Sequence, residues 1–245
     1  MLGLGIDITK ACKVSAGSAA FLPSSIASCK LWLQYQNGFT TVGGETDWER
    51  FNNNELLISW DDQIGSNNAG NAQNWQRPVW NKTFTAPQFL GTKHFDLDSP
   101  INVVGDFTFS FRLKLGGFTN EGLLGNNSAN YFEISSDNMF TADIGGTSPD
   151  NVFINDYGVL QIAVWYSVHF TRTAGILTVH VDGGSFSDMQ WGAALTDTDV
   201  FTVAGIGSWG NGTQELDGLI KDFSYFDQAL SGSERASMNT YLGGL

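Results

Sequence analysis

The chain has 245 residues and a formal net charge of −13, and only 15% of its residues are charged. This negative balance disfavours binding to nucleic-acid phosphates or to an anionic membrane surface. The sequence also contains no apolar run of the roughly 18 residues that a transmembrane helix needs. We therefore expect neither nucleic-acid binding nor membrane insertion.

The first 28 residues differ in composition from the remainder, because they are rich in Ala and Ser and hold few large apolar side chains. We interpret residues 1–28 as an N-terminal arm, with an ordinary first strand and loop as the alternative, and residues 29–245 as one domain. The start, MLGLGIDITK, lacks the basic region and long apolar core of a secretory signal. Cys12 and Cys29 do not make a disulfide framework, and whether they pair stays open.

Strand patterns are clear in the second half of the chain. Every second residue of 107–115, FTFSFRLKL, is large and apolar, which predicts a strand with one buried face. Residues 164–173 and 176–184 alternate in the same way and are joined by a short Gly-containing connection, so they predict an antiparallel hairpin. His169 and His180 then lie near each other across it. We expect both to face solvent, since no third metal ligand is identifiable.

A single helix is predicted, at the C-terminus. Ser231 and Glu234 have capping-box spacing, and Met238, Tyr241 and Leu242 share one face. Two glycines at 243–244 end the helix.

Three blocks resemble the laminin-G-like, concanavalin A-like jelly-roll family. The first is LWLQYQNG (31–38) with ISWDDQIGSNNAGNAQNWQRP (58–78), similar to a Trp-x-Asp opening that ends in Arg-Pro. The second is WYSVHFTRTAGILTVHVDGG (165–184), similar to the family's Val-Asp-Gly hairpin. The third is LDGLIKDFSYFDQALSGSERASM (216–238), similar to its closing Ala-Leu-Ser-x-x-Glu segment, and residues 95–114 resemble an intervening strand.

This resemblance implies an all-β fold, an antiparallel two-sheet jelly-roll sandwich with the short C-terminal helix and the N-terminal arm added. It also implies that the concave sheet or the rim loops are available for binding. Domains of this family occur in adhesion proteins, lectins, glycanases and phage particles, so the fold alone does not decide the function.

Enzymatic activity is not expected. Glycanases of this fold place their carboxylates as Glu-x-Asp-x-Glu on one strand, and none of the seven glutamates makes that motif. The pair Asp96 and Asp98 has the right spacing but lacks a Glu, so we interpret it as strand-end carboxylates. The three histidines are scattered, with no nucleophile motif near them.

The stretch SWDDQIGSNN (59–68) could be a structural loop or a cation site. Starting at Asp61, it lacks the ligand positions of an EF-hand. Because Asp and Asn side chains bond nearby backbone N–H groups in turns, we expect a structural loop centred on Asp62. Some relatives bind calcium at rim loops, so Asp62 is also the candidate ligand for calcium, the only cofactor considered.

A sugar site needs an aromatic platform beside amides or carboxylates. Trp191 and Trp209 lie in loop-like surroundings, and Asn211 follows Trp209 closely. These three residues are our glycan-binding candidates, with burial of both tryptophans at the ends of the core as the alternative. The tryptophans of the segment NWQRPVW (74–80) have the same two interpretations, as a sugar platform or as buried core residues.

The leading functional hypothesis is a non-enzymatic structural protein of a phage particle, as a capsid decoration, fibre or tail component. It rests on the non-secretory start and the Ala/Ser-rich arm. It implies a virion protein, assembled in the host cytoplasm, whose partners are other virion proteins, copies of itself and a host-surface glycan. The alternative is a carbohydrate-binding or adhesion module of a bacterial surface protein.

Overall fold

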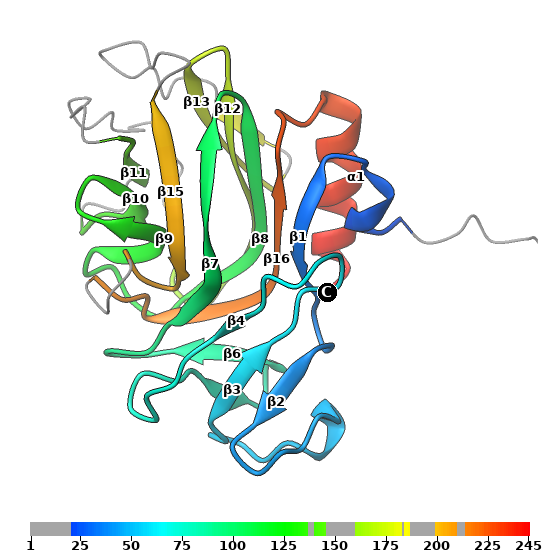
Figure 1. The fold of residues 1–245 in the computed structure, drawn as a ribbon, viewed down its shortest axis with the longest axis vertical. Coiled ribbons are helices and arrows are strands. Elements are labelled where there is room, and N and C mark those ends of the chain that lie inside the picture. The colour runs from blue at the N-terminus through cyan, green and yellow to red at the C-terminus, as the bar shows by residue number, and fades with distance from the viewer. Residues whose placement is uncertain (1–20, 137–139, 146–159, 183, 187–198, 210–213) are drawn as a thin grey trace, which may run out of the picture.

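The computed structural model describes residues 21–136, 140–145, 160–182, 184–186, 199–209 and 214–245 (Figure 1). Within these ranges the chain forms two antiparallel β-sheets that pack face to face, with one α-helix, and this confirms the predicted all-β sandwich. Two short 3₁₀ helices, η1 (Pro23–Ser25) and η2 (Trp48–Arg50), lie in connections. None of the helices in the described part is long and apolar enough to span a membrane.

The first sheet, sheet A, has the strand order β14-β13-β12-β8-β16-β6-β5, and β1 also pairs with β16. Its strands are β1 (Cys29–Leu33), β5 (Val79–Asn81), β6 (Ala86–Phe89), β8 (Phe107–Leu115), β12 (Trp165–Thr173), β13 (Ile176–Val181), β14 (Gly184–Phe186) and β16 (Gly218–Phe226). The predicted hairpin is confirmed as β12 and β13, with His169 directly opposite His180.

The second sheet, sheet B, has the order β11-β10-β9-β15-β7-β4-β3-β2. Its strands are β2 (Phe39–Thr41), β3 (Leu57–Trp60), β4 (Ala69–Gly70), β7 (Phe95–Val104), β9 (Glu121–Asn127), β10 (Asn130–Ile134), β11 (Phe140–Asp143) and β15 (Val200–Ile206). All strand pairs in both sheets are antiparallel, and they join segments that are distant in sequence.

Aromatic side chains fill the space between the sheets. Phe170 of β12 stacks on Phe132 of β10 with ring centroids 4.0 Å apart, and Phe107 of β8 stacks on Phe201 of β15 at 5.6 Å. All four rings are fully buried. Burying a Phe side chain contributes about 1.5–3 kcal/mol, so these contacts between layers supply much of the driving force for folding.

Helix α1 (Gly232–Gly243) covers part of the outward face of sheet A, beside β1 (Figure 1). The predicted capping box is present, since the Ser231 hydroxyl accepts from the Glu234 N–H and the Glu234 carboxylate accepts from the Ser231 N–H. The helix buries Met238 and Leu242 in a second apolar cluster. That cluster contains Ile26, Cys29, Trp32, Phe226, Leu230, Met238 and Leu242.

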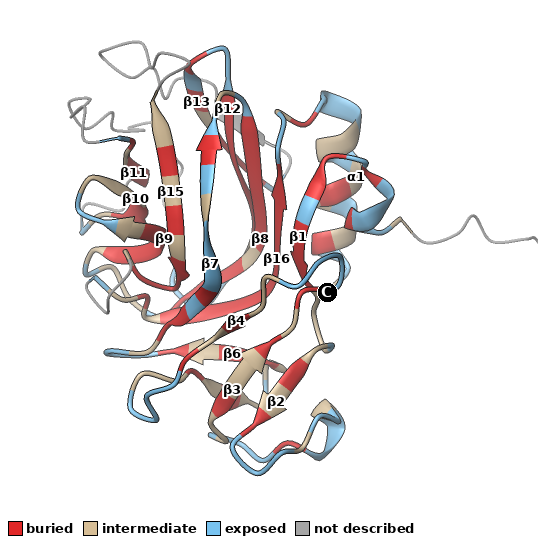
Figure 2. Cartoon of the chain, viewed as in Figure 1, coloured by how far each residue is buried: buried red, intermediate tan, exposed pale blue. Residues whose placement is uncertain are grey.

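The second cluster has two consequences. It buries the outward Phe226 at the end of β16, and with their other neighbours both β8 and β16 are almost wholly buried (Figure 2). In addition, residues 21–28, the end of the predicted arm, pack through Phe21 and Ile26 against the α1 region. Residues 1–20 lie outside the described ranges, and the arm boundary at residue 28 stays a prediction.

A buried carboxylate ties this outer layer to the sheet. Asp222 lies where the register of β16 against β8 shifts, and its side chain is fully buried. It accepts hydrogen bonds from Trp32 Nε1 at 3.2 Å, Tyr35 N at 3.0 Å and Tyr241 Oη at 2.8 Å. Burial raises the pKa of Asp222 to about 6, although these hydrogen bonds oppose the shift.

Replacement of Asp222 by Asn tests this junction. At neutral pH we expect Asp222→Asn to lower the unfolding free energy by about 1–3 kcal/mol, because an amide N–H₂ would face N–H and O–H donors. The folded-state pKa lies above the ordinary value of 3.8, so the folded protein binds the proton more tightly. The contribution of Asp222 is therefore largest near pH 4 and declines as the pH rises through about 6.

Urea unfolding of both proteins between pH 4 and pH 7.5 should show the stability difference shrinking as the pH rises. Asp227→Asn is the matched control, since Asp227 is half-exposed and pairs with Lys30 on the surface. A pH-independent difference between wild type and Asp222→Asn would contradict the prediction.

Candidate functional site

A groove of about 430 Å³ crosses the outward face of β3, β4 and β7 in sheet B. Its polar lining combines carboxylates, amides and a guanidinium, from Asp61, Asn68, Asn71, Arg77, Asp96 and Asp98. Asp96 and Asp98 face outward because they alternate with Phe95 and Leu97, which are buried on the other side of β7. Asp96 and Asp98, which the sequence analysis interpreted as strand-end carboxylates, therefore lie together in one groove near the start of β7.

Asp96 is held in place by two neighbours. Asn71 Nδ2 donates to its Oδ2 at 3.0 Å, and His94 Nε2 lies 3.4 Å from its Oδ1. The His94 ring is 1% exposed, with Nδ1 3.1 Å from the Thr92 carbonyl oxygen. Burial alone lowers the pKa of His94, but the hydrogen bond and charge of Asp96, together with the Thr92 carbonyl, outweigh burial and raise it.

Arg77 shapes the loop that borders the groove. Its Nε donates to the Asn71 carbonyl at 2.7 Å, its Nη2 donates to the Ala72 carbonyl at 3.1 Å, and its Nη1 donates to Asn74 Oδ1. The Trp75 side chain on this loop is 59% exposed. An exposed tryptophan is uncommon, because its large apolar surface usually favours burial.

The structure resolves the ambiguity of the segment NWQRPVW. Trp80 is fully buried in the core, where its ring contacts Phe39 and Phe51. Trp75, five residues earlier, is solvent-exposed on the loop between Ala72 and Arg77; these two residues line the groove, whereas Trp75 itself does not. Of the two, Trp75 meets the description of an aromatic platform.

Trp209 does not have the free ring that its loop-like sequence suggests, because the ring packs against β10. Its ring stacks on Tyr131 at 4.3 Å, and its Nε1 donates to Glu133 Oε2 at 3.0 Å. Its backbone passes close to Gly122 of β9, since a Cβ there would lie 3.0 Å from Trp209 N. One ring face is therefore occupied by Tyr131. Trp191 and Asn211 lie outside the described residues, so the predicted Trp209–Asn211 sugar contact stays a prediction.

The Asp62 carboxylate is surrounded by backbone donors. Oδ1 accepts from Trp32 N at 3.1 Å and from Ile64 N at 3.0 Å, while Oδ2 accepts from Gly65 N at 3.0 Å and Asn67 N at 3.4 Å. A side chain at Gly65 would collide with this arrangement, since its Cβ would lie 2.8 Å from Oδ2. This geometry supports the structural-loop interpretation, and Asp62 does not line the groove.

The expectation that His169 and His180 face solvent is wrong. Both rings are on the outward face of sheet A, but α1 packs over that face and buries them. Periodicity correctly gave the face of the strand that carries them. It could not show that a helix about 50 residues later in the chain covers this face.

The chain belongs to the concanavalin A-like lectin/glucanases superfamily, which it matches as a laminin-G-type domain over residues 90–234. This range includes the hairpin and most of the closing block of the sequence resemblance, whereas the opening block at 31–78 lies outside it. A comparison with curated proteins finds no significant match.

Two solved structures show how widely the fold is shared. A sialidase from Trypanosoma rangeli is 12% identical with a TM-score of 0.55, over 89% of this chain and 33% of the sialidase. Domain 4 of AbnA, a GH43 extracellular arabinanase from Geobacillus stearothermophilus in complex with arabinotriose, is 12% identical with a TM-score of 0.53, over 86% of this chain and 98% of the domain. This chain thus spans about a third of the sialidase but nearly all of the arabinanase domain, and both similarities concern the fold alone.

Asp62→Asn separates the structural loop from a calcium site. We expect the variant to lose about 1–2 kcal/mol of unfolding free energy, because one acceptor oxygen becomes a donor that faces backbone N–H groups. The loss should be the same in EDTA and in millimolar calcium, as measured by urea unfolding. Calcium-dependent stabilisation of the wild type that disappears in Asp62→Asn would instead establish the cation site.

Asp96→Asn tests the support of the groove by His94. The raised folded-state pKa means that the His94–Asp96 pair stabilises the fold below pH 6.5, the ordinary His value, and that this contribution is lost as the pH rises through the folded-state value. We expect Asp96→Asn to cost more unfolding free energy at pH 5.5 than at pH 8.5. Unfolding at both pH values checks this, with Asp98→Asn as the control, and an equal cost at the two values would count against it.

Proposed function

We propose that this chain is a non-enzymatic carbohydrate-binding domain, and that the groove on sheet B holds the sugar with Trp75 as its stacking platform. The observation that carries the proposal is a solvent-exposed tryptophan on the loop that borders a groove of amides and carboxylates. Sugar hydroxyls both donate and accept hydrogen bonds, which suits Asp, Asn and Arg side chains. The apolar face of a sugar ring suits an exposed indole.

The comparisons support the same class of ligand. The family is named for lectins and glucanases, and the arabinanase domain of similar fold was solved with arabinotriose. At 12% identity, the arabinanase domain does not indicate which sugar this chain binds. That choice depends on the side chains of this chain's own groove.

The non-enzymatic part of the proposal rests on the acids of the groove. They are all aspartates, and none of the seven glutamates of the sequence lines it. The Glu-x-Asp-x-Glu arrangement of glycanases is also missing from the sequence. We therefore propose that this groove binds its sugar without cleaving it.

The role in a phage particle remains a prediction alongside this proposal. It rests on the N-terminal segment, of which residues 1–20 lie outside the described ranges. A carbohydrate-binding domain could serve a particle that attaches to a host-surface glycan, so the two hypotheses are compatible. Mass spectrometry of purified particles tests the particle role directly.

Trp75→Ala is the sharpest test of sugar binding. On a glycan array, we expect the wild type to bind a defined set of glycans, and the variant to bind them at least about tenfold more weakly because one stacking face is lost. Stability should change by less than about 0.5 kcal/mol, since Trp75 is mostly exposed. Ile176→Ala is the matched control, because Ile176 is a 49% exposed apolar residue on β13 of the other sheet.

Trp209→Ala is the competing variant. Loss of binding in Trp209→Ala with full binding in Trp75→Ala would place the sugar at the site predicted from sequence. Absence of glycan binding by the wild type, or wild-type binding by Trp75→Ala, would overturn the groove proposal.

A further inference from the structure

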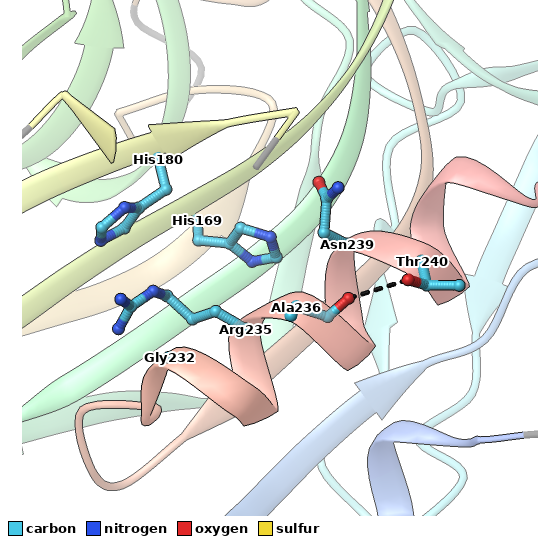
Figure 3. A pocket seen from close by; sticks show the side chains of 7 residues that line it. All are labelled: His169, His180, Gly232, Arg235, Ala236, Asn239 and Thr240. Atoms are coloured by element: carbon cyan, nitrogen blue, oxygen red, sulfur yellow. Dashed lines mark hydrogen bonds between the residues drawn. The ribbon is translucent and has the colours of Figure 1, made fainter. Parts of the chain in front are cut away.

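A second cavity of about 430 Å³ lies on the other sheet, between α1 and the outward face of the β12–β13 hairpin (Figure 3). His169 and His180 line it from the hairpin, while Arg235 and Asn239 line it from α1 together with Gly232 in the first helical turn. Figure 3 shows the Arg235 side chain extending from the helix to a position below His180, and Asn239 on the other side of His169, pointing from the helix towards the sheet. We refer to this cavity as the α1 cleft.

Two polar atoms of the α1 cleft are buried without a hydrogen-bond partner. They are His169 Nε2 and Asn239 Oδ1, and no described residue satisfies either of them. The His169 ring is only 1% exposed, and Ser110 Oγ, 2.8 Å from Nδ1, holds its orientation. An unsatisfied buried polar atom costs about 1–3 kcal/mol, so a hydrogen-bonding group that reaches either atom would stabilise the cleft.

The α1 cleft is electropositive within an acidic protein. None of the described residues that line it is acidic, although the chain carries a net charge of −13. Burial lowers the pKa of His169 to about 3 and that of His180 to about 4, and the nearby Arg235 charge adds to both shifts. Both imidazoles are therefore neutral at pH 7, and among the lining side chains that the structure describes the Arg235 guanidinium carries the one formal charge.

These features define the complementary ligand. The guanidinium disfavours a metal ion and favours an anion, and its single charge matches a monoanion. Arg235 donates one N–H to the Leu230 carbonyl and keeps further N–H groups for a ligand. When the Ser110 hydroxyl donates to Nδ1 of His169, Nε2 carries the proton and becomes a second donor. Asn239 Oδ1 is an acceptor, which a simple anion cannot satisfy but a hydroxyl group can.

We propose that the α1 cleft binds a small hydroxylated carboxylate, of the kind found in sugar acids and hydroxy acids. The carboxylate accepts from Arg235 and from His169 Nε2, and a neighbouring hydroxyl donates to Asn239 Oδ1. This site lies on sheet A, whereas the proposed sugar groove lies on sheet B, so each stands without the other.

The test is an NMR titration of the full-length ¹⁵N-labelled protein, with the imidazole signals of His169 and His180 as the readout. The probes are glucuronate, a sugar acid, and glycolate, the smallest hydroxy acid. Two compounds serve as controls: glucose, which lacks the carboxylate, and acetate, which lacks the hydroxyl. We expect saturable shifts of the His169 Nε2 signal with at least one of the two hydroxylated carboxylates, and at least tenfold weaker binding of glucose and acetate. A response to glucuronate alone identifies the ligand class as sugar acids, and a response to glycolate alone identifies it as free hydroxy acids.

Two variants assign the binding groups. Arg235→Gln removes the charge, and we expect it to abolish the shifts. Asn239→Leu removes the unsatisfied acceptor, so it should weaken binding at least tenfold while the protein stays as stable as the wild type or becomes more stable. Ser237→Ala on the same helix is the control and should bind normally.

Trp75→Ala should leave the His169 response unchanged, which keeps this result separate from the groove proposal. Absence of any saturable shift with either hydroxylated carboxylate would overturn the inference. Equal binding of acetate, or full binding by Arg235→Gln, would do the same.

Discussion

The buried carboxylate of Asp222 is the constraint on which the outer layer of this protein depends. It receives donors from the segment after β1, from the indole of Trp32 and from Tyr241 on α1, so three parts of the chain meet at one charge. Burial of a carboxylate is costly unless its lone pairs are satisfied, and here they are. The junction holds α1 against sheet A in one position, and the apolar contacts of Met238 and Leu242 then stabilise the layer.

The docked helix changes what the outward face of sheet A can do. Without α1, His169 and His180 would be ordinary exposed residues of a hairpin. Beneath the helix they become neutral, buried bases that share a cleft with Arg235. In the part of the chain that the structure describes, no helix covers β3, β4 and β7 of sheet B, and their outward carboxylates and amides line an open groove. The two outward faces therefore have opposite character: one is closed and electropositive, and the other is open and rich in acids.

Local patterns account for the parts of the fold that sequence predicted well. The alternation in β8, the β12–β13 hairpin and the capping box of α1 each depend on residues within about ten positions of one another. The Asp62 loop belongs with them, because three of its four backbone donors come from Ile64 to Asn67 and only one, Trp32 N, is distant. The candidate site was harder to predict. Whether Trp75 or Trp80 enters the core depends on where the loop leaves the sheet, and neighbouring residues do not encode that choice.

By itself, the sequence determined the class of fold, the strand faces, the helix cap and the family, because hydrophobic periodicity and capping are short-range properties. Only the tertiary structure decided which polar residues share a site. Asp61 and Asp96 line one groove because β3, β4 and β7 are adjacent in sheet B. His169 and Arg235 line one cleft because α1 folds back over β12 from 60 residues further along the chain. Such contacts arise from strand order and from the docking of a helix, which are long-range outcomes of packing and leave no local pattern in the sequence.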